Sequence, residues 1–116
     1  MPYEKTLEDL AARRAAALAM GSPKRLAERR EAGILNARER LALLFDPGSF
    51  EEAGLLAQSV RPEMAGRTPA DGVVSGFGRI EGRLAGANAA DFTTYGSSSA
   101  ETHGKKQGFV RAACEK

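Results

Sequence analysis

The sequence has very little of several residue types on which common functional sites are built. Its 116 residues include one cysteine, Cys114, one histidine, His103, and no tryptophan. A single cysteine cannot form an internal disulfide, and neither residue has a Cys or His companion at metal-ligand spacing. A histidine without a partner also favours a surface or helix-packing role over that of a general base. The composition therefore excludes a disulfide scaffold and predicts no metal site and no catalytic triad.

Charge, aromatic residues and long apolar runs are equally scarce. A net charge of +2 is too small for a nucleic-acid surface, and aromatic residues do not alternate with basic ones as in single-strand binders. No apolar run approaches the ~20 residues that span a bilayer, and the N-terminus lacks a signal-peptide pattern. We therefore expect a cytoplasmic chain that binds neither membrane nor nucleic acid. With only 6% aromatic residues, its own core would be thin, which predicts protein partners.

The N-terminal part of the chain is rich in helical patterns. Apolar residues recur at helical spacing over residues 3–20, and Ser22 and Pro23 suit the start of a second helix to about residue 33. Asn36 and Glu39 form a variant of the capping box that starts a third helix. The second helix is so polar that we expect it on a surface or across another chain. For Arg38 we expect an acidic partner in the arm or in a neighbouring subunit.

The C-terminal part changes to strand patterns. Residues 50–60 fit either a short strand or a loose turn of helix, and residues 61–72, with two prolines and two glycines, are expected to form a loop. Residues 73–80 and 83–90 predict two strands joined by a two-residue turn. This β-hairpin is expected to begin a larger sheet, and a helix is predicted over residues 100–116.

The stretch Asp91–Lys106 joins the second strand to that last helix. Gly96 permits positive φ, and the helix that follows presents free N–H groups at its positive end. Small hydroxyl side chains lie between them, those of Ser97, Ser98 and Ser99. This pattern is typical of a cradle for an anion or a thioester. A Ser-rich cap on an ordinary helix explains the same residues, because Ser is among the best capping residues.

Four segments of the chain follow one another in the order that is found in one protein family. They are Ala32–Leu41 (AGILNARERL), Leu44–Glu52 (LFDPGSFEE), Ala70–Arg83 (ADGVVSGFGRIEGR) and Asp91–Thr93 (DFT). Together they closely resemble the carboxyltransferase (β) subunit of biotin-dependent acyl-CoA carboxylases, such as propionyl-CoA and acetyl-CoA carboxylases.

The resemblance implies an α+β fold. It comprises a helical N-terminal arm, residues 1–49, and the start of a crotonase-like (ClpP-type) carboxyltransferase domain, residues 50–116, with its first β-hairpin and βα unit. The spiral of ββα units that completes this fold would be missing from the chain.

The resemblance also implies the chemistry and the partners. In the family, acyl-CoA is held by the N-terminal half of one subunit and carboxybiotin by the C-terminal half of a neighbour. Backbone N–H pairs stabilise an enolate of the thioester, so no catalytic side chain and no metal is expected. Biotin would be carried by a partner protein and not bound directly by this chain. Implied partners are acyl-CoA, the carboxyltransferase remainder or full-length subunits, biotin carboxylase and the biotin carrier protein, within an oligomer.

For the acyl-CoA site, the resemblance implies a loop and two cations of this chain. The loop residues that would lie against acyl-CoA are Tyr95, Gly96, Ser97, Ser98 and Ser99. Lys105 and Lys106 would meet the phosphates of acyl-CoA as point charges. Two solvated lysines on a helix are the alternative. The family commonly has Phe-Gly-Gly-Ser in this loop, and here a serine replaces the second glycine.

Two functions are therefore expected from the sequence. In the first, the chain is an N-terminal part or small split subunit of a carboxyltransferase and contributes one wall of the acyl-CoA site. It would be inactive alone, because the later glycine-pair loops that form the oxyanion holes have no counterpart in it. In the second, it is a non-catalytic assembly or regulatory subunit that binds a full-length carboxyltransferase through its helical arm.

Overall fold

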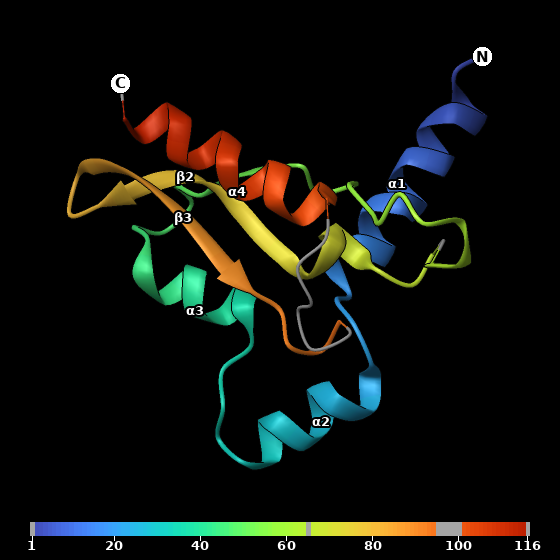
Figure 1. Ribbon diagram of the computed structural model, residues 1–116, viewed down its shortest axis with the longest axis horizontal. Helices are drawn as coiled ribbons and strands as arrows, with labels where there is room; N and C mark the ends of the chain where they lie inside the picture. Colours follow the sequence, from blue (N-terminus) through green and yellow to red (C-terminus); the bar gives the residue numbers. More distant parts are fainter. Residues whose placement is uncertain (1, 65, 95–100, 116) are drawn as a thin grey trace.

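The computed structural model describes residues 2–64, 66–94 and 101–115, and within them it contains four α-helices and one three-stranded sheet (Figure 1). The elements in chain order are α1 (Glu4–Leu18), α2 (Pro23–Glu31), α3 (Ala37–Leu44), β1 (Glu51–Ala53), the 3-10 turns η1 (Pro62–Met64) and η2 (Pro69–Gly72), β2 (Val73–Ile80), β3 (Arg83–Ala90) and α4 (Glu101–Cys114).

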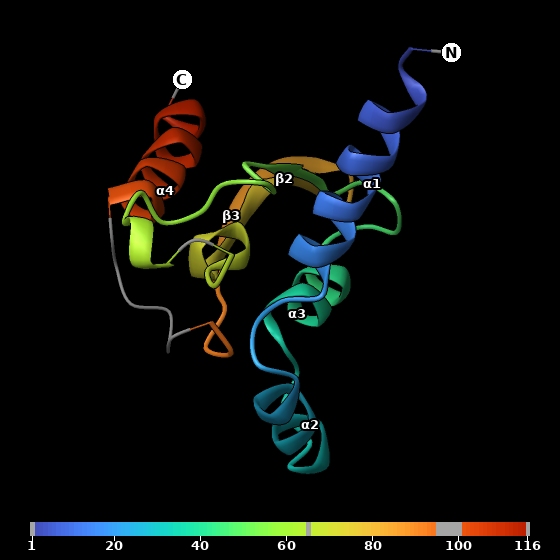
Figure 2. The same ribbon diagram turned by 90° about the vertical axis from the view of Figure 1, so that its right-hand side faces the viewer.

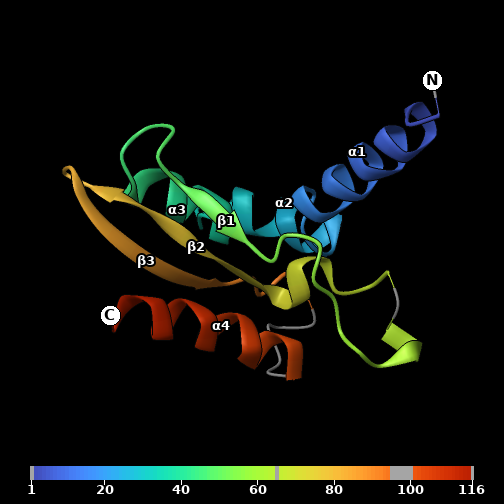
Figure 3. The same cartoon turned by 90° about the horizontal axis from the view of Figure 1, so that it is seen from above.

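The sheet lies between helices α3 and α4, as the view from above shows (Figure 3). Its strand order is β1-β2-β3 and both pairings are antiparallel. In the hairpin, Val73 lies opposite Ala90 and Ile80 lies opposite Arg83, so the two strands pair over their whole length. This register confirms the predicted hairpin and its two-residue turn.

The core lies on the α3 side of the sheet. Because side chains alternate across a strand, every second residue of β2 and β3 faces this side. The buried core residues come from the third helix, the connections of the arm and β2, and half-buried residues pack against them. The buried members are Met20, Ala37, Leu41, Phe45 and Val74, and the half-buried ones are Leu26, Phe50, Ile80, Ala85, Ala87 and Ala89. Many members of this set are alanines, so the core is thin, as its composition predicts.

Helix α4 packs on the opposite face of the sheet. Phe109 meets Phe77 of β2 edge to face, with the ring centroids 6.1 Å apart. At Gly86 a Cβ would lie only 2.9 Å from a methyl carbon of Val110, so the missing side chain lets the helix approach β3 closely. The hairpin thus supplies one face to the arm helices and the other to α4.

Helices α1 and α2 extend from the body in different directions (Figures 1 and 2). They meet at Met20, a buried residue with a left-handed φ of 67°, and Ser22 caps α2 by accepting a hydrogen bond from the Arg25 amide. No residue of α2 is fully buried, which confirms the surface location predicted for it. The predicted capping box of α3 is present, with Asn36 and Glu39 each bonded to the other's amide.

Three regions differ from, or add to, the sequence expectations. Glu52, on β1, is the partner of Arg38 through both terminal (Nη) guanidinium nitrogens, so the expectation of a partner in the arm or in another subunit was wrong. The ambiguous residues 50–60 contain the short strand β1, and the expected loop 61–72 contains η1 and η2.

Among the described helices, none combines the length and the apolar character needed to cross a membrane.

Candidate functional site

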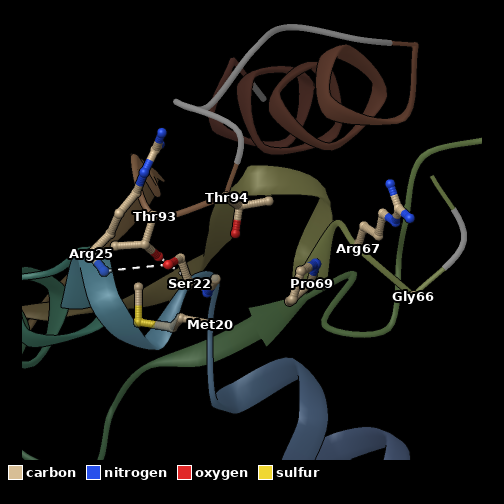
Figure 4. Close-up of a pocket in the computed structure, with 9 residues that line it drawn as sticks. Met20, Ser22, Arg25, Gly66, Arg67, Pro69, Thr93 and Thr94 are labelled. Atoms are coloured by element: carbon tan, nitrogen blue, oxygen red, sulfur yellow. Dashed lines mark hydrogen bonds between the residues drawn. The ribbon is translucent and has the colours of Figure 1, made fainter. Parts of the chain in front are cut away.

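A cavity of about 440 Å³ lies where the α1–α2 connection meets the end of the hairpin (Figure 4). Its walls come from three parts of the chain: the α1–α2 connection with the start of α2, the segment that leads into η2 with its first residue, and the residues after β3. The lining residues are Met20, Gly21, Ser22, Arg25, Gly66, Arg67, Pro69, Thr93 and Thr94. We call it the arginine cavity.

The arginine cavity has the charge of an anion site. Arg25 and Arg67 lie on opposite sides of it, with Thr93 and Thr94 between them (Figure 4). None of its lining residues is acidic, so two exposed arginines line the space without a carboxylate among the walls. Guanidinium groups donate strong, charge-assisted hydrogen bonds to phosphate oxygens. The Arg25 guanidinium donates weakly to the Phe92 carbonyl at 3.4 Å, which holds it beside the cavity.

A buried carboxylate shapes the wall formed by the two threonines. Asp91, 4% exposed, accepts hydrogen bonds from the Thr93 amide at 2.9 Å, the Thr93 hydroxyl at 2.5 Å and the Thr94 hydroxyl at 2.9 Å. This Asx-type turn ends β3 and fixes both threonine side chains. Because three donors meet one carboxylate, its buried charge is compensated.

The same wall holds the arm in place. The Gly21 amide donates to the Thr93 hydroxyl at 3.1 Å, and the Ser22 amide donates to the Thr93 carbonyl at 2.9 Å. Gly21 and Thr93 are 72 positions apart in sequence, so these two main-chain donors join distant parts of the chain. The arginine cavity therefore exists only because the α1–α2 connection docks on the end of β3.

The residues predicted for the acyl-CoA site have different positions. Lys105 is exposed on α4. Lys106 is 8% exposed, and its ammonium donates to the main-chain carbonyls of Ala70 at 2.6 Å and Val73 at 2.5 Å, so in this structure it does not point at solvent. The loop residues lie outside the described residues, directly after Thr94; they are Tyr95, Gly96, Ser97, Ser98 and Ser99.

The surroundings of Lys106 change its ionisation. Desolvation by burial lowers the pKa of Lys106 from 10.5 to about 8, against the attraction of Glu52, which acts in the opposite direction. The side chain of His103, 3% exposed, lies one turn away on the same helix, and its Nδ1 is 2.9 Å from the Asp71 carbonyl. A carbonyl only accepts, so Nδ1 carries the proton. Of the surface and helix-packing roles predicted for His103, the structure shows the second.

Sequence reasoning missed the two arginines and Gly21. Arg25 and Arg67 are 42 positions apart, and only docking of the arm brings them to one cavity. The pair Thr93–Thr94 offered a signal, since an aspartate two or three residues before hydroxyl side chains is the pattern of an Asx turn. That signal predicts the Asx turn but not the two arginines that line the same cavity.

Comparison with known proteins places the chain in one family. The family described as "Carboxyl transferase domain" matches residues 28–116. The propionyl-CoA carboxylase beta chains of Cereibacter sphaeroides and Roseobacter denitrificans are 41% and 46% identical over 103 residues, which cover 86% of this chain and 20% of each relative. The chain therefore spans about a fifth of the length of these relatives.

The solved structures agree with the sequence relatives. A crystal structure of transcarboxylase 12S, described as a hexamer with methylmalonyl-coenzyme A and methylmalonic acid bound, matches 95% of this chain with a TM-score of 0.86 and 37% identity. The match covers 22% of that protein. The hairpin, its flanking helices and the arm thus have the arrangement found in a crotonase-like carboxyltransferase, as the sequence predicted. This chain belongs to the carboxyl transferase domain family, that of the beta chains of acyl-CoA carboxylases.

Proposed function

We propose that this chain supplies one wall of the acyl-CoA site of a carboxyltransferase, which moves a carboxyl group from carboxybiotin to an acyl-CoA. The observation that carries the proposal is the arginine cavity, which has two arginines and no acid in its lining. Coenzyme A bears several phosphate charges, and arginines bind phosphate through paired, charge-assisted hydrogen bonds. The cavity suits that phosphate-bearing part of the molecule.

The names of similar proteins support a CoA thioester as the ligand. The relatives are called propionyl-CoA carboxylase beta chains, and transcarboxylase 12S is described with methylmalonyl-coenzyme A bound. We infer an acyl-CoA as the substrate class. Contact of Lys105 with acyl-CoA stays a prediction, as does contact of the loop residues Tyr95, Gly96, Ser97, Ser98 and Ser99 with the thioester. The contact predicted for Lys106 would require its ammonium to leave the carbonyls of Ala70 and Val73.

In this proposal the chain binds and orients its ligand, while the enolate of the thioester is stabilised by backbone donors elsewhere in the complete domain. Removal of even one such donor costs about 10²- to 10³-fold in rate, so the 116 residues alone should not catalyse the transfer. The carboxyl group would arrive as carboxybiotin on a biotin carrier protein, loaded by a biotin carboxylase. No described residue is assigned to biotin. The remainder of the domain, or full-length subunits in an oligomer, would complete the site.

The proposal is tested by titrating CoA and propionyl-CoA against the purified chain by calorimetry, with pantetheine as the phosphate-free probe. Arg25→Gln and Arg67→Gln should each weaken CoA binding by about 5- to 30-fold, the loss of a partly exposed charge-assisted contact. Added salt should weaken CoA binding as well, because the contact is between exposed charges.

Arg83→Gln is the matched control, because Arg83 is an exposed arginine at the hairpin turn, at the opposite end of β3 from the arginine cavity. It should leave the affinity for CoA unchanged. Equal weakening by all three variants, or equal binding of pantetheine and CoA, would contradict a phosphate site in the cavity.

A second function, assembly with a full-length carboxyltransferase, has an observation in its favour. Helix α1 carries several exposed apolar residues, Leu7, Leu10 and Leu18, which are 61%, 41% and 49% exposed, and it extends away from the body (Figure 1). Exposed apolar residues of this kind are typical of a surface that binds another protein. If assembly is the function, Leu7→Lys should abolish co-elution with a full-length carboxyltransferase and leave CoA binding intact; unchanged co-elution would exclude α1 as the contact.

A further inference from the structure

The four residues from Ala70 to Val73 form a turn with an unusual backbone. Ala70, Asp71 and Gly72 have consecutive left-handed φ values of 51°, 50° and 74°. For a residue other than glycine, this conformation costs about 1–2 kcal/mol. Two such residues in sequence require support from outside the turn. We call these four residues the 70–73 turn.

Helix α4 supplies part of that support. The Lys106 ammonium donates to the carbonyls of Ala70 and Val73, at 2.6 and 2.5 Å, and the His103 ring donates to the Asp71 carbonyl at 2.9 Å. The two side chains are three residues apart and therefore share one face of the helix. Three carbonyls of the turn are thus held by the first two turns of α4.

The fourth carbonyl of the turn belongs to Gly72 and accepts a hydrogen bond from the Asp91 amide at 2.9 Å. Asp91 is the residue whose carboxylate holds Thr93 and Thr94, one wall of the arginine cavity. The opposite wall, which includes Arg67, leads directly into the 70–73 turn. Both walls are therefore attached to the same four residues.

The chemical type of Lys106 is unexpected for a purely structural position. A buried ammonium group carries a desolvation cost, which a methionine of similar length would avoid. The neighbouring Asp71 carboxylate has a buried oxygen without a hydrogen-bond partner among the described residues, and its charge favours the ammonium. What lysine offers here, and methionine cannot, is a donor shared between two carbonyls of a strained turn.

We propose that Lys106 and His103 are positioning residues of the arginine cavity, which act through the 70–73 turn and set the distance between the wall with Arg67 and the wall with Thr93 and Thr94. The proposal rests on the proposed function for the role of the cavity, but its geometry concerns the unliganded chain. Neither residue touches the ligand in this arrangement.

The test uses the full chain and separates positioning from binding. The amide NMR signals and hydrogen-exchange rates of Thr93 and Thr94 report the threonine wall without ligand, because the amides of both residues are bonded to Asp91. Lys106→Met should shift these signals, speed their exchange at least about 10-fold and weaken CoA binding by a similar factor. Lys106→Arg, which restores two donors, should recover both properties in part.

Arg111→Met is the control, since it removes an exposed cation from the same helix, and it should change neither property. Unchanged Thr93 and Thr94 amides in Lys106→Met, with a lowered melting temperature only, would overturn the proposal. If the wild-type chain binds no CoA, the proposed function fails while the amide signals still decide the positioning role.

Should Lys106→Met not fold, a pair of histidine variants gives the same decision. His103→Asn keeps an N–H close to the position of Nδ1 and should preserve the Thr93 and Thr94 amides, whereas His103→Leu should shift them. Identical spectra of the two histidine variants would overturn the proposal.

Discussion

Gly21 offers the sharpest test of how the arm is attached. A Cβ at this position would lie 1.9 Å from the Thr93 carbonyl oxygen, 2.2 Å from its carbon and 2.7 Å from the Thr94 nitrogen. All three atoms belong to the main chain and cannot rotate away, so Gly21→Ala must separate the α1–α2 connection from the end of β3.

The cost of that separation follows from the bonds that it breaks. The amides of Gly21 and Ser22 would lose their bonds to the Thr93 hydroxyl and carbonyl, now 3.1 and 2.9 Å long. At about 1 kcal/mol per hydrogen bond, with about 1–2 kcal/mol for the overpacking, the free energy of unfolding should fall by about 3–4 kcal/mol. That is a large part of the roughly 5–15 kcal/mol typical of a domain.

Urea titration measures the loss, and hydrogen exchange at the Ser22 amide shows where it arises. Gly108→Ala is the control, because a Cβ at Gly108 meets nothing within 4 Å and alanine favours the helix by up to about 1 kcal/mol. It should therefore stabilise the chain. A Gly21→Ala variant within about 0.5 kcal/mol of wild type, the usual scatter of neutral surface changes, with Ser22 still protected, would refute the reasoning.

Three further predictions concern side chains outside the α1–α2 connection. Glu52→Gln should lower the free energy of unfolding, measured by urea titration, by about 1–3 kcal/mol, because it breaks the ion pair with Arg38. The side chains of Arg38 and Glu52 are only 20% and 12% exposed. The same change in an Arg38→Met background should cost less, and equal costs would argue against direct coupling. Asp46→Ala should lower the free energy of unfolding by about 1–2 kcal/mol, since the carboxylate accepts hydrogen bonds from both amides of the hairpin turn at 2.9 Å. Asp46→Asn should cost less, and an alanine variant as stable as wild type would contradict this capping role. The pKa of Lys106 is lowered from 10.5 to about 8, so between these two pH values the unfolded chain holds a proton that the folded chain has released. The free energy of unfolding, relative to that of Lys106→Met, should therefore rise with pH in this window, by about 2 kcal/mol after allowance for solvent screening. A difference between the two proteins that is flat from about pH 7 to pH 10.5 would show that Lys106 keeps its ordinary pKa.

The sequence predicts those parts of the fold that depend on neighbouring residues. The hairpin strands have the predicted bounds, because the apolar pattern and the two-residue turn are local signals. The same holds for the capping box of Asn36 and Glu39. The family and its fold also follow from four short segments in order, and the comparisons confirm both.

The site is less predictable, because long-range contacts form it. Burial of Lys106 depends on the 70–73 turn, 33 or more positions away, and lysine on a helix ordinarily stays in water. The partner of Arg38 was missed for a related reason: Glu52 reaches it only when β1 pairs with β2. Neither Arg25 nor Arg67 has a local feature that marks it as part of a cavity.

The connection at Met20 has a consequence for how the arm can move. Most left-handed residues that reverse a chain are glycines and impose no side-chain condition on the reversal. Here the reversing residue is also a core residue: Met20 is 7% exposed and packs with Leu41, Phe45 and Val74. The direction of α1 is therefore coupled to the packing of the domain, and the helix cannot swing as a rigid lever without withdrawing a methionine from the core.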